Sequence, residues 1–280
     1  MNNKTNKHKR EFVWFRRWVE QGHTISHLSS ISKHSTRKLH YIIDHWLNQE
    51  PPTKKAKIAR CRYGIFDGTF LHRPDSVIVI MDAQDHTVIA SNYPARENSA
   101  KQLNSFLGGL KEQGLSLESV TLDGNPSAIR TFRQLWPGIT IQRCLVHIQR
   151  QGIMWCRAKP QMEPAKKLRE LFVRTTYIRT QQQRETFVRD LEQWENKYGD
   201  VIDNFPSSHK VLSDLKRARS MILKALPDMF YYLNDSNIPF STNSLEGYFS
   251  RVKWAYRNHR GLAKHKRINY FKWYTFLKQI

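Results

Sequence analysis

The sequence has 280 residues, enough for one substantial core and a small appendage, and its 39% hydrophobic and 12% aromatic content excludes a disordered chain. Its 46 Lys and Arg outnumber 24 Asp and Glu, and the resulting formal charge of +22 is spread along the whole chain. This charge predicts a polyanionic partner, and nucleic acid comes before a membrane surface because no apolar run approaches the roughly 20 residues of a spanning helix.

The cysteines favour a reducing compartment. Cys61, Cys144 and Cys156 are widely spaced and give no disulfide framework. No apolar block follows the basic N-terminal residues, as it would in a signal peptide. We therefore expect a cytoplasmic location.

Residues 1–50 predict a small all-α module. The polar and basic residues through Arg10 are expected to form a loose arm, and apolar residues at helical spacing then run from Phe12 to a stop at Gly22. Thr24 and Ser35 suit the starts of two short helices, and such a pair after a supporting helix is the helix-turn-helix pattern. A plain three-helix bundle is the alternative. The last helix exposes five candidates for DNA contacts: Thr36, Arg37, Lys38, His40 and Tyr41.

A basic linker is predicted at residues 51–62, followed by a mixed sheet. The linker holds Pro51-Pro52 and a run of Lys and Arg that is either solvated or laid along a phosphate backbone. Periodicity then predicts three meandering strands, a helix, a strand, a helix and a last strand, at 62–71, 76–81, 87–93, 99–113, 117–122, 127–136 and 139–143. This order is that of an RNase H-like α/β fold, with helices on both faces of the sheet.

Two aspartates stand where buried strands are expected to be apolar. Asp67 lies inside the first strand, and Asp123 ends the fourth. A buried carboxylate requires compensation, which a bound cation provides. The first and fourth strands are neighbours in this topology, so the two carboxylates would face each other with something positive between them. The alternative, a simple turn at an Asp-Gly pair, applies to Asp123 more than to Asp67, because the strand continues after Asp67.

Four segments in order carry a resemblance to a known family. They are Tyr63-Gly-Ile-Phe-Asp67-Gly-Thr, Val120-Thr-Leu-Asp123-Gly, Cys144-Leu-Val-His147 and Ser241-Thr-Asn-Ser-Leu-Glu246-Gly. Together they resemble the Mutator-like DDE transposases and their bacterial insertion-sequence relatives, from about Arg62 to the C-terminus. The resemblance implies an RNase H-like catalytic domain at 63–280 with a helical insertion at about 150–238. The helical pattern from Pro164 to Leu233 supports the insertion independently.

The resemblance assigns catalysis and metal binding to Asp67, Asp123 and Glu246. Two Mg²⁺ (or Mn²⁺) ions held roughly 4 Å apart by carboxylates would activate the attacking oxygen and stabilise the leaving one. Glu246 has a structural alternative, because Asn243 suits the N-cap of a helix with Glu246 at its third position, a capping box.

Cys144 and His147 form a signature that the resemblance places near the site. A buried cysteine beside a satisfied core histidine is one alternative. Another is a zinc site completed by Cys156 and His209, since a closed zinc site needs four ligands.

The C-terminal segment from Ser250 interleaves cations with aromatic residues. Aromatic residues at helical spacing indicate core packing more than stacking on bases. Three cations close to Glu246 are the candidates for DNA contacts: Arg251, Lys253 and Arg257.

The predicted function is that of a transposase that binds transposon-end DNA, cleaves it and transfers the 3′-hydroxyl ends to target DNA. Its partners would be double-stranded DNA, as terminal inverted repeats and as target, and pairing two ends favours a homodimer or larger assembly. The bacterial relatives imply association with the nucleoid. The alternatives are an RNase H-like nuclease without strand transfer, and an inactive domesticated DNA-binding protein, against which the retention of all three acids counts.

Overall fold

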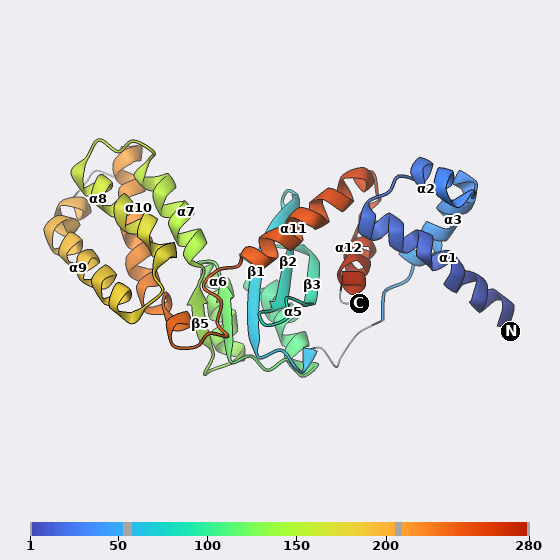
Figure 1. Ribbon diagram of the computed structural model, residues 1–280, viewed down its shortest axis with the longest axis horizontal. Helices are drawn as coiled ribbons and strands as arrows, with labels where there is room; N and C mark the ends of the chain where they lie inside the picture. The colour runs from blue at the N-terminus through green and yellow to red at the C-terminus, as the bar shows by residue number, and fades with distance from the viewer. Residues whose placement is uncertain (1, 53–57, 205–208, 279–280) are drawn as a thin grey trace. The chain divides into compact units, whose positions relative to one another are not determined.

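The computed structural model describes residues 2–52, 58–204 and 209–278, and the chain divides into two compact units (Figure 1). The first unit comprises residues 1–62, 67–116 and 244–280, and the second comprises residues 63–66 and 117–243. Three lysines of the predicted linker, Lys54, Lys55 and Lys57, lie outside the described residues. None of the helices in the described ranges is long and apolar enough to cross a membrane.

Five strands form one mixed sheet in the order β3-β2-β1-β4-β5. The strands are β1 (Tyr63–His72), β2 (Asp75–Asp82), β3 (Val88–Ala95), β4 (Ser119–Leu122) and β5 (Thr140–Arg143). β2 and β3 are antiparallel, whereas β4 runs parallel to both β1 and β5. The predicted α/β class and the predicted pairing of the first and fourth strands are therefore confirmed.

Local capping determines where the N-terminal helices begin. Thr24 and Ser35 accept hydrogen bonds from backbone N–H groups three residues ahead, as predicted, and Gly22 ends the first helix with φ +61°. The prediction of a loose arm through Arg10 is wrong, because the first helix already includes these residues. No Gly or Pro interrupts it. The three helices are α1 (Asn2–Gln21), α2 (Ile25–Ser32) and α3 (Thr36–Leu47).

The N-terminal helices pack against α12 (Lys264–Lys278) within the first unit. The indole Nε1 of Trp273 lies 3.0 and 2.8 Å from the backbone oxygens of Trp46 and Gln49, and the Tyr270 hydroxyl donates to the backbone oxygen of Val19 at 3.0 Å. Residues 1–50 are therefore held by side chains more than 220 positions away, in addition to the segment that follows them.

His259 is buried where the N-terminal helices meet α12 and the residues ahead of it, and we expect its burial to reduce stability in acid. Its ring lies 4.0 Å from the Trp18 ring at a tilt of 34°, and Nε2 donates to the Trp18 backbone oxygen at 3.0 Å. Burial lowers the pKa of His259 to about 4, whereas an unfolded histidine titrates near 6.5. Between about pH 4 and 6.5, His259 therefore stays neutral in the folded protein, whereas the same residue takes up a proton in the unfolded chain.

We expect the unfolding free energy to be unaffected by His259 above about pH 6.5 and to fall by up to about 3 kcal/mol as the pH drops toward 4. Urea denaturation of the protein and of His259→Gln at several pH values measures this contribution. The variant should show a weaker pH dependence between pH 4 and 6.5, and equal slopes in the two proteins would contradict the assignment.

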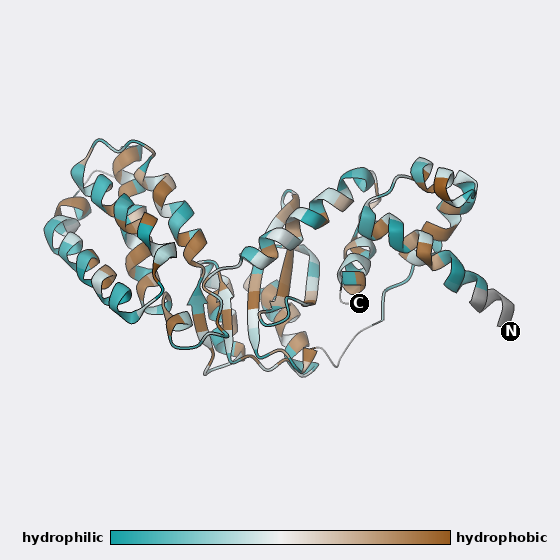
Figure 2. Cartoon of the chain, viewed as in Figure 1, coloured by the Kyte–Doolittle hydropathy of each residue, from teal (hydrophilic) through white to brown (hydrophobic). Residues whose placement is uncertain are grey.

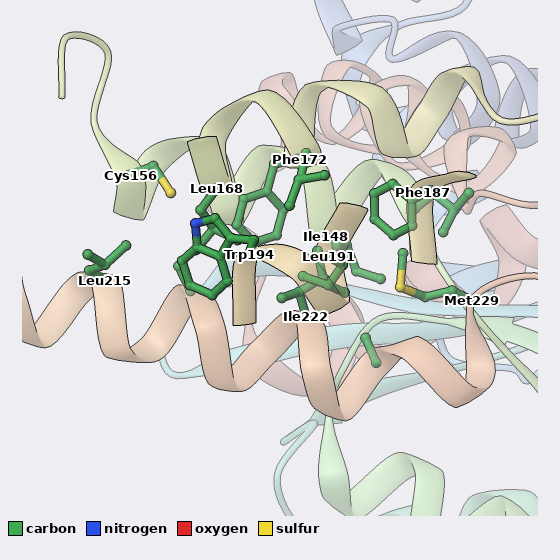
Figure 3. Close-up of a cluster of buried hydrophobic side chains, with 14 of the residues drawn as sticks. Ile148, Cys156, Leu168, Phe172, Phe187, Leu191, Trp194, Leu215, Ile222 and Met229 are labelled. Carbon is green, nitrogen blue, oxygen red and sulfur yellow. The ribbon is translucent and has the colours of Figure 1, made fainter. Parts of the chain in front are cut away.

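Four helices in the second unit share one hydrophobic cluster and fill the interval between β5 and the helix that carries Glu246. They are α7 (Leu145–Cys156), α8 (Glu163–Arg174), α9 (Gln181–Asp203) and α10 (Lys210–Ala225). Figure 3 shows side chains from all four converging, with Phe172, Phe187 and Trp194 among the largest. In Figure 2 hydrophilic and hydrophobic residues alternate along α8 and α9, as expected of helices with one buried face. The structure thus agrees with the helical pattern predicted for 164–233.

Two further helices accompany the strands. α5 (Ala100–Glu112) begins after the N-cap Ser99, and α6 (Pro126–Leu135) begins after the N-cap Asn125. In the second unit α6 packs on the start of β1, where the rings of Phe66 and Phe132 lie 5.2 Å apart. α6 therefore fixes the residues that follow β4.

Candidate active site

Asp67 lies in β1, directly after the last residue of β1 that pairs with β4. Its side chain is only 9% exposed, and Oδ1 accepts a hydrogen bond from the backbone N–H of Gly68 at 2.8 Å. A Cβ atom at Gly68 would lie 2.5 Å from the carboxyl carbon of Glu97, so the absence of a side chain there makes room for Glu97. Sequence patterns gave no signal for Glu97, because it lies in a turn 30 residues after Asp67.

Asp123 directly follows β4 and shapes the turn into α6. Its Oδ1 accepts a hydrogen bond from the Asn125 backbone N–H at 2.9 Å, and the Asn125 side chain in turn caps α6. The turn predicted as the alternative role of Asp123 is therefore present. A carboxylate that accepts one such bond still has lone pairs for another ligand, so the turn does not exclude metal binding.

The register of β1 and β4 relates the two aspartates. Phe66 pairs with Leu122, and Asp67 and Asp123 are the residues that directly follow this pair. The carboxyl ends of parallel strands in an open α/β sheet are where ligands bind. Both acids thus occupy equivalent positions along adjacent parallel strands.

Glu246 lies in the first turns of α11 (Asn243–Tyr256). Asn243 is the first helical residue, so the N-cap position falls on Thr242 and the third helical position on Leu245. The helix thus begins one residue earlier than the predicted capping box requires, and the capping role of Glu246 stays a prediction. Two turns further along α11, Lys253 Nζ donates to Thr69 Oγ1 at 2.6 Å, which ties this helix to β1 within the first unit.

Cys144 and His147 contact the segment that leads into α11. The Cys144 thiol accepts a hydrogen bond from the Thr242 backbone N–H at 3.4 Å, and the Thr242 hydroxyl lies 3.5 Å from His147 Nδ1. Two backbone carbonyls of the same segment, those of Pro239 and Phe240, accept hydrogen bonds from the end of β4 and the start of α7. The signature therefore anchors the residues just ahead of Glu246, a role that its spacing did not reveal.

Burial would raise the pKa of the Cys144 thiol, but its contacts with His147 and Thr242 outweigh burial, and the net pKa is lowered. The alternative zinc site is not supported by the position of Cys156, which lies at the opposite end of α7 in the hydrophobic cluster.

Replacement of Thr242 with Val should lower the unfolding free energy by about 1 kcal/mol. Thr242 is fully buried, and valine keeps its shape while removing the hydroxyl that contacts Cys144 and His147. Urea denaturation of Thr242→Val measures the loss. Thr186→Val, at a partly exposed position on α9, is the control and should change stability less. Equal effects in the two variants would argue against the anchoring role.

Arg143, at the end of β5, is a site residue that sequence reasoning missed. It is only 8% exposed, and burial lowers the pKa of its guanidinium against the opposing charges of Asp123 and Asp228. A Cβ atom at Gly124 would collide with this guanidinium, so Gly124 is required for Arg143 to lie there. The Asp-Gly pair after β4 thus serves a close approach as well as a turn.

The predicted DNA contacts differ in their surroundings. Thr36, Arg37, His40 and Tyr41 are exposed on α3, whereas Lys38 forms an ion pair with Glu11 at 2.5 Å. In the C-terminal segment the predicted contacts Arg251, Lys253 and Arg257 are exposed. The aromatic residues there are mostly buried, as predicted, with the exception of Trp254, which is 60% exposed.

The predicted ligands suit Mg²⁺ by their chemistry. Among the described residues, no three His, Cys, Asp or Glu side chains form a group that could hold a metal ion. Asp67 and Glu246 belong to the first unit and Asp123 to the second. Mg²⁺ keeps several waters and is usually held by one or two carboxylates together with substrate phosphates, so it does not require a preformed cage. The buried Asp67 carboxylate is the kind of charge that a cation stabilises.

Comparison with known proteins identifies the chain's relatives by sequence. Residues 77–264, about two thirds of the chain, match the family described as "Transposase, Mutator family". The matched range includes Asp123, the Cys144–His147 signature and Glu246, and it begins ten residues after Asp67. No curated protein matches the chain.

Proposed function

The chain belongs to the Mutator family of transposases, and on that premise we propose that it binds transposon-end DNA, cleaves it and joins the 3′-hydroxyl ends to target DNA. The observation that carries this proposal is the register of β1 and β4. Asp67 and Asp123 directly follow a pair of adjacent residues on parallel strands, and the carboxyl ends of such strands are where ligands bind. The catalytic domain is then RNase H-like and of the DDE type.

Asp67, Asp123 and Glu246 would hold two Mg²⁺ or Mn²⁺ ions. When bound, such a pair activates the attacking oxygen and stabilises the leaving oxygen of an in-line displacement at phosphorus. All three side chains would supply carboxylate oxygens, the hard ligands that these ions prefer. The bond between Lys253 and Thr69 holds α11 on β1 two residues beyond Asp67, which helps to keep Glu246 in position.

DNA contacts are assigned to two surfaces. On α3, which we take as the recognition helix of a helix-turn-helix, the exposed side chains Thr36, Arg37, His40 and Tyr41 would reach base edges and phosphates. Lys38 contributes charge from beside Glu11. On the C-terminal segment Arg251, Lys253 and Arg257 would contact phosphates near Glu246. Pairing of two transposon ends requires a dimer or a larger assembly.

A strand-transfer assay tests the proposal. The purified protein is incubated with Mg²⁺, a labelled duplex that carries the terminal inverted repeat flanking its own gene, and a supercoiled target plasmid. We expect labelled DNA joined covalently to the plasmid. Cleaved but unjoined duplex would instead support a nuclease, and binding with neither product would support an inactive DNA-binding protein.

Removal of divalent ions should abolish both cleavage and joining. Carboxylates that face one another without a cation cannot activate the attacking oxygen. Chelation with EDTA followed by addition of Mg²⁺ or Mn²⁺ should restore the activity, whereas Zn²⁺ should not restore it at the same concentration, since the ligands are all hard oxygens. Full activity in the presence of excess chelator would contradict the metal-dependent mechanism.

A further inference from the structure

We propose that a basic pocket in the second unit binds a phosphate group of the DNA strand next to the site of cleavage. The pocket has a volume of about 640 Å³ and lies where the end of β5, α6 and the end of α10 meet. Its charged lining consists of Arg130, Arg133, Arg143, Lys224 and Asp228. The ligand chemistry rests on the proposed function, since DNA is the polyanion that a transposase handles.

The charges in the pocket are unbalanced in favour of cations. Asp228 forms an ion pair with Arg133 at 2.9 Å. Asp228 is the one acidic side chain among the lining residues, so this pair neutralises the negative charge of the lining. Arg130 and Lys224 are exposed and form no ion pair with any described residue. Cations that converge on one cavity repel each other, and a bound anion relieves this repulsion. The lining is therefore better matched to a phosphate than to a neutral or cationic ligand.

Arg143 is the second observation that points to an anion. More than nine-tenths of its surface is buried, and its Nε atom has no hydrogen-bond partner among the described residues. A buried and incompletely bonded guanidinium costs free energy unless a ligand completes its bonds, and the planar fork of arginine matches a phosphate. The strand geometry keeps Arg143 in the pocket, because it is the last residue of β5 and its guanidinium fits over the bare Cα of Gly124.

The pocket adjoins the proposed catalytic residue. Gly124, which lines the pocket, directly follows Asp123, and Arg143 carries electrostatic interactions with both Asp123 and Asp228. A phosphate held here would belong to the same DNA strand as the one that is cut, a short distance along its backbone. The pocket thus would position the strand, and Arg143 would be a positioning residue.

The salt dependence of DNA binding tests the pocket. The variant Arg130→Gln/Lys224→Gln removes two exposed pocket cations, and Arg189→Gln/Lys197→Gln removes one Arg and one Lys from exposed positions of α9 in the same unit. Both variants lose the same net charge. Binding of a fluorescein-labelled DNA duplex is followed by anisotropy over a series of NaCl concentrations, and the slope of log K against log salt counts the phosphates contacted.

We expect the pocket variant to reduce the magnitude of the slope by about 1 to 2, and the α9 variant to leave it unchanged. An unchanged slope in the pocket variant, or an equal reduction in both variants, would overturn the proposal. The wild-type strand-transfer assay decides the proposed function separately. If the wild-type protein gives joined product and the pocket variant has an unchanged slope, only the phosphate-binding role of the pocket is rejected. If the slope is reduced but the wild-type protein gives no joined product, only the transposase chemistry is rejected.

Discussion

Asp67→Asn is expected to reduce DNA cleavage and strand transfer by about a thousandfold or more while leaving DNA binding intact. Asparagine keeps the shape of the side chain and can still accept the Gly68 hydrogen bond, but it loses the negative charge that would bridge two metal ions. Metal ions contribute several kcal/mol of charge stabilisation in the transition state, and each 1.36 kcal/mol corresponds to tenfold in rate. The strand-transfer assay and the anisotropy titration measure the two properties in one preparation.

Asp82→Asn is the matched control for this variant. Asp82 ends β2 in the same unit, is also 9% exposed, and its Oδ1 accepts a backbone hydrogen bond from Gln84 at 2.8 Å. The two aspartates therefore share burial and local bonding but differ in their place relative to β4. Activity should survive in Asp82→Asn. Equal losses of activity in both variants would show that replacing a buried aspartate lowers activity by destabilising the protein. Full activity in Asp67→Asn would show that Asp67 is not a metal ligand.

Phe172→Ala is expected to lower the free energy of unfolding of the second unit by about 3–5 kcal/mol, because it removes a fully buried aromatic ring from the centre of the helical cluster. The ring lies directly against Gly152 of α7, where a Cβ atom would collide with it (Figure 3 shows the cluster). The cavity left by alanine therefore cannot close from the α7 side without movement of the helix backbone. Hydrogen exchange at the amides of α7 to α10 measures the local loss of protection.

Tyr177→Ala provides the control for Phe172→Ala. Tyr177 is an aromatic residue of the same unit, in the 3-10 helix η1 (Thr175–Tyr177), but 71% of its surface is exposed. Its removal should change stability by less than about 0.5 kcal/mol. If the amides of α7 to α10 exchanged no faster in Phe172→Ala than in Tyr177→Ala, the hydrophobic cluster would not be the stabilising core of these four helices.

The helical insertion also bears on function through its connections. α7 begins at the Cys144–His147 signature, and α10 supplies Lys224 to the basic pocket. Loss of the hydrophobic cluster should therefore disturb the anchoring of Thr242 and the pocket together. Phe172→Ala should lower strand-transfer activity at temperatures where the second unit is partly unfolded and recover it on cooling.

The starts of four helices and all five strands could be predicted from local sequence. Thr24, Ser35, Ser99 and Asn125 each cap a helix through a hydrogen bond that spans two or three residues, so the information lies within a short window. The positions of Asp67 and Asp123 followed in the same way, because strand order and strand ends place them after paired residues. The error at residues 2–10 and the one-residue difference at Asn243 concern helix boundaries, which shift by a residue or more at small cost in free energy.

The sequence by itself determined most of the elements, their order, and the places of Asp67 inside the first strand and Asp123 after the fourth, since these depend on periodicity, capping and turn chemistry between near neighbours. Only the tertiary structure decided which distant residues meet. Glu97 lies over Gly68, Arg143 over Gly124, Thr242 against Cys144, and the N-terminal helices against α12. These contacts join positions from 19 to more than 220 residues apart, and their free energy comes from packing that forms once the chain is folded. No local pattern encodes such pairs, which is why the pocket beside Asp123 could not be predicted from the sequence.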